Sequence, residues 1–312
     1  MTLRHKKIMI TGGTGMVAHA LQKLIPNATF VKSISYDLRN QSDVNDLFIN
    51  VNPEYVIHLA AKVGGIKANA NNLGTFYYDN VMMNTNLLEA SRKYKVKKLI
   101  SVLSTCIYPD NAIYPLTEGQ IHYGPPHSSN YGYAHAKRML DVQSRAYREQ
   151  FGCNFITVVP NNLFGPGDNF DLEDSHVIPA LIRKMFEAIQ TDSDVVLWGD
   201  GSPLREFTYS EDFARILLFL LESYNDKDPI NVGNTKEWKI SQIADIIASF
   251  IGFTNNIVWD ETQLTGQKKK PSCNNKLLNL GWSKENYTSF EEGIQKTCQW
   301  FLETYPNIRG IR

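Results

Sequence analysis

The feature that most constrains the fold is a glycine loop between a short apolar strand and an amphipathic helix. Lys7–Thr11 (KIMIT) predicts a buried strand, and Gly12–Ala18 (GGTGMVA) follows it directly. Apolar residues then recur at helical spacing through Leu21 and Leu24. Strand, glycine loop and helix in this order are typical of dinucleotide binding, because the loop backbone and the helix N-terminus face the pyrophosphate. The residues expected to contact it are Gly12, Gly15, Met16 and Val17; a glycine turn without a ligand is the alternative.

The next predicted strand, Ala28–Lys32, bears on the choice between NAD and NADP. NAD-selective sites place an Asp or Glu near the end of this strand, where it binds the ribose hydroxyls. Here Lys32 and Ser33 stand at that place, and a lysine with hydroxyls suits a 2′-phosphate better. Asp37 lies farther on, either near the adenine or in a surface turn. The predicted cofactor is therefore NADP(H).

Tyr133 and Lys137 lie four residues apart, so on a helix they share one side. A tyrosine with a pKa of about 10 is a poor acid–base catalyst at neutral pH, but a nearby ammonium lowers that pKa. Ser104 can hydrogen-bond the same substrate oxygen, which completes the groups needed to reduce a carbonyl or oxidise an alcohol. Cys106 adds a thiol that hydride transfer does not require. A solvated helix surface is the alternative reading of the Tyr–Lys pair.

The first half of the chain alternates predicted strands and helices, which indicates a parallel sheet covered on both sides. The further strands are Tyr55–Leu59, Lys98–Leu103 and Phe155–Val159, and the helices are Asp43–Asn50, Val81–Tyr94 and Tyr133–Phe151. Ligands of such folds bind beyond the carboxyl ends of the strands. The segments that follow these strands are the glycine loop, His58–Ala61, Ser104–Cys106 and Pro160–Asn162. Their convergence on one sheet edge favours an enzyme.

The regular alternation of predicted strands and helices ends after Gly165–Asp168. The later predicted elements are helices Ile178–Thr191, Ser210–Leu221, Ser241–Ile251 and Ser289–Thr304 and strands Val195–Trp198 and Pro229–Asn234, the last of which returns to the sheet. The predicted class is α/β: a Rossmann-type doubly wound parallel sheet with a smaller C-terminal α/β substrate-binding lobe. We expect residues 1–165 plus about 205–235 to form the NADP-binding domain, and about 166–204 plus 236–312 the substrate-binding domain.

Composition narrows the function classes. The chain of 312 residues has 32 basic and 32 acidic side chains, so no strongly basic surface argues for nucleic acid. The run Lys268–Lys270 suits a solvated loop or a local phosphate contact. The cysteines Cys106, Cys153, Cys273 and Cys298 lack paired metal-ligand spacing, so no metal is expected. No apolar stretch has signal or membrane length, and we expect a cytoplasmic protein.

The chain resembles the extended short-chain dehydrogenase/reductases, and within them the 3,5-epimerase/4-reductases of GDP-4-keto-6-deoxy-D-mannose. The most specific matching segments are His58–Ile66 (HLAAKVGGI), Leu103–Pro109 (LSTCIYP) and Leu172–Lys184 (LEDSHVIPALIRK). Further matches, at Ile10–Val17, Ser129–Met139, Pro160–Phe170 and Trp198–Phe207, extend the resemblance over nearly the whole chain. One departure is Gly13-Thr14, where bacterial members carry a His-Arg pair that could help to hold a 2′-phosphate.

The resemblance implies epimerisation at C3 and C5 of the 4-keto sugar and then reduction at C4 by NADPH, which yields GDP-L-fucose. In such an epimerisation a base removes a proton made acidic by the ketone, and an acid returns one on the opposite side. The resemblance assigns this work to Cys106 and His176; from the residues alone, a buried core cysteine and a structural helix-start histidine are the alternatives. It further implies that Tyr133 protonates the oxygen, that Lys137 lowers the pKa of Tyr133 and holds the nicotinamide ribose, and that Ser104 orients the carbonyl.

The resemblance also implies further contacts. Those with the cofactor are Ala60, Ala61, Pro160, Asn162 and Leu163, together with Tyr133, Lys137 and His176; they add to Lys32 and Ser33, which the residue types suggest. Those with the substrate are Lys184, Trp198 and Arg205, of which the planar guanidinium of Arg205 suits a diphosphate. An ordinary surface charge is the alternative for Lys184 and for Arg205. The expected partners are a GDP-linked 4-keto-6-deoxy sugar and a second copy of the chain, with Val81–Tyr94 and Tyr133–Phe151 at the dimer interface, and neither nucleic acid nor membrane. An enzyme for another nucleotide-linked keto sugar, such as a GDP-keto-heptose, and a non-catalytic NADP-binding regulatory protein are the rivals.

Overall fold

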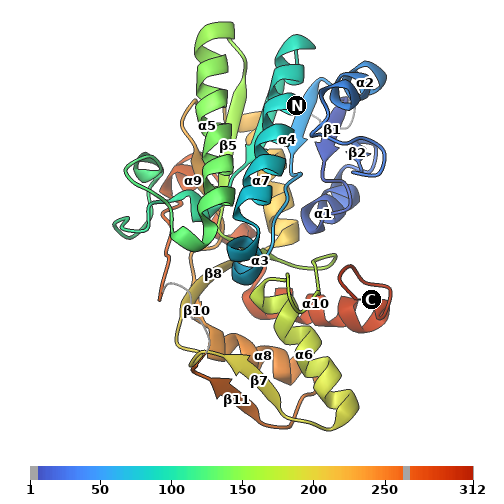
Figure 1. Cartoon of the computed structure of the whole chain (residues 1–312), viewed down its shortest axis with the longest axis vertical. Coiled ribbons are helices and arrows are strands. Elements are labelled where there is room, and N and C mark those ends of the chain that lie inside the picture. The colour runs from blue at the N-terminus through green and yellow to red at the C-terminus, as the bar shows by residue number, and fades with distance from the viewer. Residues whose placement is uncertain (1–5, 263–267, 312) are drawn as a thin grey trace.

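The structure is a computed structural model that describes residues 6–262 and 268–311. Figure 1 shows a larger part, in which helices flank a sheet, above a smaller part built from later segments of the chain. The N-terminus belongs to the larger part and the C-terminus to the smaller one. Within the described ranges, no helix is long and apolar enough to cross a membrane.

The larger part contains a six-stranded sheet whose neighbours all pair in parallel, in the order β2-β1-β3-β4-β5-β9. Its strands are β1 (Ile8–Thr11), β2 (Thr29–Val31), β3 (Tyr55–His58), β4 (Lys98–Val102), β5 (Phe155–Pro160) and β9 (Ile230–Val232). Because they are parallel, their carboxyl ends meet at one edge of the sheet. This confirms the predicted doubly wound α/β class and the return of Pro229–Asn234 to the sheet.

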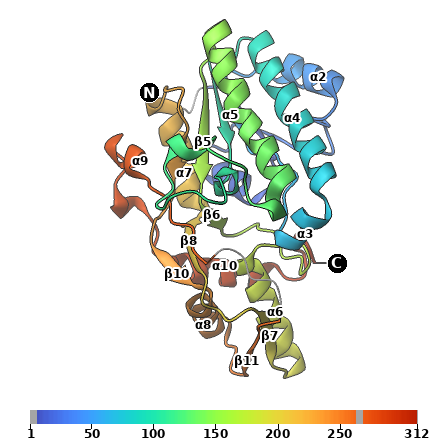
Figure 2. The same cartoon turned by 60° about the vertical axis from the view of Figure 1, so that its left-hand side comes forward.

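Helices cover both sides of this sheet (Figure 2). They are α1 (Met16–Leu24), α2 (Gln41–Val51), α4 (Leu73–Lys93), α5 (Tyr131–Phe151) and α7 (Ser210–Ser223). Side chains of a strand alternate between its two sides, so Ile8 and Ile10 join a core with α1 and α7, while Met9 joins a second core with α2, α4 and α5. The strands therefore carry nearly continuous apolar runs, as buried parallel strands do.

Helix α4 begins eight residues before the predicted start at Val81. Its first turns pack against the start of α5, where a Cβ added at Gly132 would lie 2.1 Å from the carbonyl oxygen of Leu73. The side chain of Asn80 also donates to the carbonyl oxygen of Lys62, at 2.8 Å. The prediction was wrong there because these turns depend on tertiary contacts rather than on an apolar period.

The smaller part has a three-stranded sheet, β10-β8-β6, and a two-stranded parallel sheet, β11-β7. Its elements are β6 (Asn162–Phe164), α6 (Val177–Thr191), β7 (Val195–Trp198), β8 (Leu204–Tyr209), β10 (Glu237–Lys239), α8 (Ile240–Ile251), β11 (Ile257–Asp260) and α10 (Phe290–Thr304), and two short helices complete the fold, α3 (Ile66–Asn71) and α9 (Asn275–Asn279). A core rich in aromatic rings joins the strands of this part with α6, α8 and α10, with Phe164, Phe207 and Phe290 in mutual ring contact. Helix α9 packs instead on the larger part, through Leu277. The interleaved domain boundaries stay a prediction.

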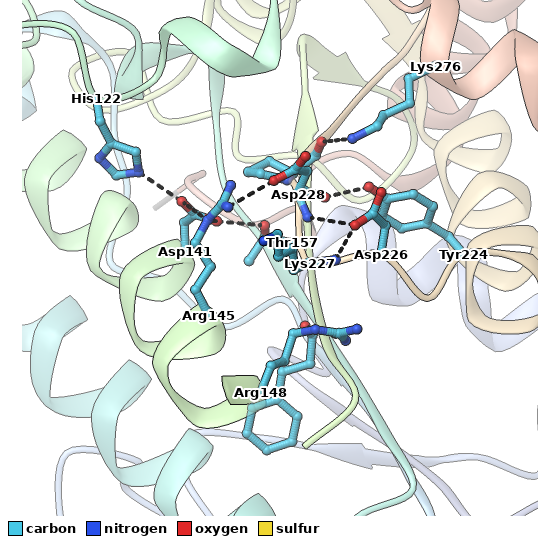
Figure 3. Close-up of polar contacts among 12 residues, drawn as sticks. His122, Asp141, Arg145, Arg148, Thr157, Tyr224, Asp226, Lys227, Asp228 and Lys276 are labelled. Atoms are coloured by element: carbon cyan, nitrogen blue, oxygen red, sulfur yellow. Dashed lines mark hydrogen bonds and ion pairs between the residues drawn. The ribbon is translucent and has the colours of Figure 1, made fainter. Parts of the chain in front are cut away.

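The connection between β4 and α5, residues 103–130, is tied to α5 by a polar network centred on the buried Asp141 (Figure 3). Asp141 of α5 is fully buried and accepts hydrogen bonds from His122 of the connection at 2.8 Å and from Arg145 at 2.9 Å. Arg145 also pairs with Asp228, in the loop before β9, at 2.8 Å. The connection is thereby fixed to the helix that carries Tyr133 and Lys137.

Lys98, at the start of β4, is a lysine with only 3% of its surface exposed. Its Nζ donates to the carbonyl oxygens of Leu220 and Leu221 in the last turn of α7, both at 2.8 Å. Burial, with a smaller contribution from the charge of Arg148, lowers the pKa of Lys98 from 10.5 to about 8.

This shift predicts that Lys98 makes the free energy of unfolding rise between pH 8 and pH 10.5, because there the unfolded side chain still binds a proton that the folded one has lost. The difference in this free energy, wild type minus Lys98→Met, should grow by about 2–3 kcal/mol across the window. Urea unfolding at several pH values measures it. Lys97→Met, which removes an exposed partner of Glu54, serves as the control without such a rise; a constant difference for Lys98→Met would contradict the prediction.

Candidate active site at the carboxyl edge of the sheet

The glycine loop after β1 is packed too tightly for side chains. Gly12 has a φ of +73°, and a Cβ there would lie 2.9 Å from the backbone nitrogen of Ala60. A Cβ at Gly13 would lie 2.8 Å from the carbonyl carbon of Phe30. Glycine is the residue that tolerates both the positive φ and the close approach. The loop thus runs directly against the segments that follow β2 and β3.

The start of α1 suits a pyrophosphate. Gly15 is its N-cap, no side chain among the described residues caps it, and its first turn has no acidic residue. The first backbone N–H groups of the helix are therefore available to an anion, which the helix dipole also favours. A Cβ at Gly167 would lie 3.7 Å from Cα of Met16, so the loop after β6 lies next to this helix start. These residues fit a dinucleotide.

Lys32 and Ser33 follow β2 directly and are exposed. The carboxylate of Asp37 accepts hydrogen bonds from Arg39 at 2.8 and 2.9 Å, and these bonds hold the pKa of Asp37 below its usual value. Arg39 also pairs with Asp79 at 3.1 Å. Since Asp37 is bonded to Arg39, this corner does not present a lone carboxylate of the kind that selects NAD.

A buried hydrogen-bonded chain fixes the segment after β3. The backbone N–H of Ala60 donates to Oγ1 of Thr11 at 3.2 Å, and Oγ1 lies 2.7 Å from Nδ1 of His58. The other ring nitrogen of His58 lies 2.9 Å from Oδ1 of Asn84, whose amide donates to the carbonyl oxygen of Ala136 at 3.2 Å. Burial, and then the charge of a nearby lysine, lower the pKa of His58 to about 3, so the ring is neutral. This chain joins β1, β3, α4 and α5.

Asn84→Ala should lower the free energy of unfolding by about 1–3 kcal/mol, because it leaves the buried ring nitrogen of His58 and the carbonyl oxygen of Ala136 without their partner. Denaturant unfolding measures the loss. Asn86→Ala, in the same helix, removes bonds to carbonyl oxygens at a more exposed position and should cost less. An equal loss in the two variants would contradict the importance of the buried chain.

The structure brings the predicted reduction groups together with the predicted thiol. Tyr133 and Lys137 lie in the first turns of α5 with 8% and 2% of their surfaces exposed. Nζ of Lys137 donates to the carbonyl oxygen of Val102 at 2.8 Å and lies 5.8 Å from the centre of the Tyr133 ring. Ser104 precedes a short 3₁₀ helix, Thr105–Ile107, and its Oγ accepts from the backbone nitrogen of Cys106 at 3.4 Å.

The pKa values in this cluster are set mainly by burial. Burial raises the pKa of Cys106, against which act the charge of Lys270, the hydrogen bond with Ser104 and the charge of Lys137. Burial lowers the pKa of Lys137 to about 8. The pKa of Tyr133 is raised by burial and by Cys106, so the expected lowering by Lys137 is not what the structure shows. The reason is that burial of the phenol outweighs the effect of the Lys137 ammonium, which lies 5.8 Å from the ring centre.

His176 is the N-cap of α6 and is exposed. Asp174 and Ser175, the two residues before His176, contact the loop after β3. The backbone nitrogen of Gly65 donates to the carbonyl oxygen of Asp174 at 2.9 Å. A Cβ added at Gly65 would lie 2.8 Å from the carbonyl oxygen of Ser175. The glycine thus permits a close approach between this loop and the start of α6. The buried carboxyl of Asp168, whose pKa burial raises, is within electrostatic reach of His176.

Arg205, on β8, shares its surroundings with Lys270, a residue that the sequence left unassigned. Burial lowers the pKa of both side chains, and the charge of Arg205 contributes to the shift at Lys270. Lys270 also interacts with the Cys106 thiol. Two hydrogen bonds fix the segment that carries Lys270. Leu116 N donates to the carbonyl oxygen of Pro271 at 2.8 Å, and the backbone nitrogen of Ser272 donates to the buried carboxylate of Glu206 on β8.

Lys184 and Trp198 form a second group in the smaller part. Nζ of Lys184, in α6, donates to the carbonyl oxygen of Val196 at 3.2 Å and lies 5.8 Å from the ring centre of Trp198. Trp198 ends β7 with 53% of its surface exposed. An exposed indole beside a lysine offers a flat apolar surface together with a cation.

The remaining predicted contacts lie at the same sheet edge. Pro160 is the last residue of β5, and Asn162 and Leu163 begin β6, where the Asn162 amide donates to the carbonyl oxygen of Glu206 at 2.8 Å. Ala61 packs against a small apolar cluster that includes Tyr133. The sequence placed these residues by their position after strands; it did not assign Lys270, for which a run of lysines was the only signal.

Comparisons with known proteins agree with this arrangement. Residues 8–233 match the NAD dependent epimerase/dehydratase family. A GDP-L-fucose synthase from Dictyostelium discoideum is 38% identical, over 99% of this chain and 99% of its own length. The crystal structure of a GDP-L-fucose synthetase from Naegleria fowleri bound to NADP has a TM-score of 0.92 and 42% identity, over 99% of this chain and 97% of that one. A GDP-6-OMe-4-keto-L-xylo-heptose reductase from C. jejuni has a TM-score of 0.90 and 26% identity, over 97% and 99%.

The matched region begins at β1 and ends after β9, so it contains the whole six-stranded sheet and the glycine loop. The relatives extend the similarity through the smaller part. The resemblance drawn from the motifs is thereby confirmed. The chain belongs to the NAD dependent epimerase/dehydratase family.

Proposed function

We propose that the protein converts GDP-4-keto-6-deoxy-D-mannose to GDP-L-fucose, by epimerisation at C3 and C5 and NADPH-dependent reduction at C4. The observation that carries this function is the placement of the Cys106 thiol in one cluster with Tyr133 and Lys137. Reduction alone needs no such thiol. The GDP-L-fucose synthases of Dictyostelium discoideum and Naegleria fowleri, similar over nearly the whole chain, support the same reaction.

In the epimerisation, Cys106 and His176 exchange the protons at C3 and C5. The C4 ketone acidifies both C–H bonds, so a thiolate can remove a proton and leave an enediolate, which an acid reprotonates from the opposite side. The charges of Lys270 and Lys137 oppose the effect of burial on the Cys106 pKa and so favour the thiolate. His176 is the proposed second acid–base group, and its exposure permits proton exchange with water.

In the reduction, Tyr133 donates its phenolic proton to the C4 oxygen. Because burial raises its pKa, the phenol keeps its proton at neutral pH and is present in the donor form. Ser104 orients the carbonyl by a hydrogen bond, and Lys137 supplies a cation on the same side of α5. NADPH, when bound, supplies the hydride to C4.

The cofactor is NADP(H). The glycine loop with Met16 and Val17 holds its pyrophosphate, and Lys32 and Ser33 bind the 2′-phosphate. The proposed contacts nearer the nicotinamide are Ala60, Ala61, Tyr133, Lys137, Pro160, Asn162, Leu163 and His176.

The nucleotide diphosphate of the substrate binds to Arg205, assisted by Lys184, which has Trp198 beside it. Arg205 suits this role because its planar guanidinium can bond two oxygen atoms at once. The proposed domains are an NADP-binding domain of residues 1–165 plus about 205–235 and a substrate-binding domain of about 166–204 plus 236–312, with Arg205 at their boundary and Ser104, Cys106 and Tyr133 reaching the sugar from the first.

A homodimer formed through α4 and α5 is part of this proposal, as is a place in the cytoplasm. The two helices lie side by side in both views (Figure 1 and Figure 2). They expose apolar side chains that a second copy would cover, among them Tyr78, Met139 and Val142. Sedimentation of the purified protein tests the dimer.

A GDP-keto-heptose is the second candidate substrate, because the C. jejuni heptose reductase has nearly the same fold. Steady-state assays with each keto sugar, and with NADPH and NADH in turn, separate the two functions. We expect faster oxidation of NADPH with the 6-deoxy sugar, and GDP-L-fucose as the product. Faster turnover of the heptose, or of NADH, would overturn the substrate or the cofactor assignment respectively.

A further inference from the structure

Arg138 is a buried arginine next to the site that the reaction described above does not use. It follows Lys137 in α5 and has only 5% of its surface exposed. Its Nε donates to the carbonyl oxygen of Ile107 at 2.6 Å, and its Nη1 donates to that of Gly124 at 2.7 Å. Its Nη2 is buried and has no partner among the described residues. A guanidinium is costly to bury, so its place between two carbonyl groups requires an explanation.

The two carbonyl groups belong to the connection that carries Ser104 and Cys106. Ile107 ends the 3₁₀ helix that contains Cys106. Gly124 lies where the connection folds back on itself, since the backbone nitrogen of Asp110 donates to the carbonyl oxygen of Pro125 at 3.0 Å. Arg138 therefore joins the turn of the thiol and the return of the connection to one point of α5.

Lys137 and Arg138 bond the chain on both sides of the catalytic turn, residues 103–106, which carries Ser104 and Cys106. Lys137 bonds the carbonyl oxygen of Val102, before the turn, at 2.8 Å, and Arg138 bonds that of Ile107, directly after it, at 2.6 Å. Two consecutive cations of α5 thus fix both ends of the segment that presents Ser104 and Cys106. Tyr133 lies on the same helix, so α5 alone fixes the position of the thiol relative to the phenol.

The charge of Arg138 also reaches the thiol. Burial lowers the pKa of Arg138, and the neighbouring Cys106 opposes that shift. Among the described residues, the charges of Lys270 and Lys137 act on Cys106, and Cys106 in turn contributes to the pKa shifts of Arg138 and Tyr133 on α5. Arg138 differs from the two lysines because a guanidinium keeps its charge across the working pH range.

We infer that Arg138 is a positioning residue for the Cys106 thiol: it holds the catalytic turn against α5 and its permanent charge favours the thiolate. This inference rests on the proposed role of Cys106. It predicts that the charge and the paired hydrogen bonds of Arg138 have separable effects, the first on the ionisation of the thiol and the second on its placement.

Alkylation of Cys106 by iodoacetamide tests the charge, because only the thiolate reacts. The rate is followed against pH by mass spectrometry of the peptide that contains Cys106. In Arg138→Gln, which is neutral but still a donor, the midpoint should move to higher pH by about 0.5–1 unit. In Arg138→Lys, which keeps the charge, the midpoint should stay near that of the wild type. Thermal unfolding of both variants shows that they are folded.

Arg148→Gln is the matched control. Arg148 lies in the same helix about 15 Å farther along, and it too bonds carbonyl oxygens, those of Phe155 and Asn225. This control should leave the Cys106 midpoint unchanged. An unchanged midpoint in Arg138→Gln, or an equal shift in Arg148→Gln, would overturn the inference.

Deuterium exchange at C3 and C5 of the keto sugar tests the placement. Arg138→Lys cannot bond both carbonyl groups as a fork does, so its exchange should be about tenfold slower although the midpoint is preserved. Exchange at the wild-type rate would overturn the placement half of the inference. A wild-type protein that exchanges nothing would overturn the proposed function, while the alkylation profile would still decide the inference.

Discussion

Replacing Tyr133 by Phe should lower kcat for NADPH oxidation by about 10³-fold, the usual size of a general acid's contribution. The variant loses the phenolic proton that the C4 oxygen receives. The ring remains, and its packing against Ala61 and Cys106 is kept, so NADPH affinity should change by less than about twofold. Stopped-flow absorbance measures turnover, and quenching of protein fluorescence measures NADPH binding.

Tyr131→Phe is the control for this variant. Tyr131 lies two residues earlier in the same helix, with 53% of its surface exposed and its ring against His135. Its hydroxyl has no part in the proposed reaction, so turnover should be that of the wild type. Substantial turnover by Tyr133→Phe would show that another group protonates the oxygen.

Cys106→Ser should slow deuterium incorporation at C3 and C5 by about 10³-fold, since a serine hydroxyl does not ionise near neutral pH and so cannot act as the base. The exchange is followed in heavy water without NADPH, so that reduction does not contribute. The substitution is nearly isosteric, and the hydrogen bond from the backbone nitrogen of residue 106 to Ser104 remains available. The loss is therefore expected to be chemical rather than structural.

Cys153→Ser provides the comparison. Cys153 is partly buried beside α5 and packs against the core on that side of the sheet. It takes no part in the proposed exchange, and its variant should incorporate deuterium at the wild-type rate. Equal incorporation by Cys106→Ser and by the wild type would reject the thiol as the base.

The sheet could be predicted from the sequence because local signals agree with the global fold. Each predicted strand is an apolar run, and parallel pairing makes their carboxyl ends meet at one edge. The glycine loop, the segment after His58, and the turns at Ser104 and at Pro160 lie at this edge for that reason. Fold class and the approximate place of the site followed from the alternation of strands and helices and from the segments that come after the strands.

The smaller part could not be predicted to the same depth. Strand β6 has three residues and pairs with β8 through Asn162 and Phe207, which lie far apart in the sequence. Such short strands have no pattern of their own and exist through tertiary pairing. Lys270 acts electrostatically on the thiol for a similar reason: Leu116, more than a hundred residues earlier, holds the segment that follows Lys270.

The pKa of Tyr133 shows why residue types alone were insufficient. The spacing of Tyr133 and Lys137 correctly placed both side chains on one side of α5. It could not show that the ammonium would bond the carbonyl oxygen of Val102, or that burial would dominate the phenol. The direction of the shift depends on these contacts, which only the folded chain supplies.

The most direct test of the central claim is the reaction of the purified protein with GDP-4-keto-6-deoxy-D-mannose and NADPH in heavy water, followed by NMR of the product. We expect GDP-L-fucose with deuterium at C3 and C5, taken from the solvent, and protium at C4, taken from NADPH. Protium at C3 and C5, or no oxidation of NADPH by protein that binds it, would contradict the account.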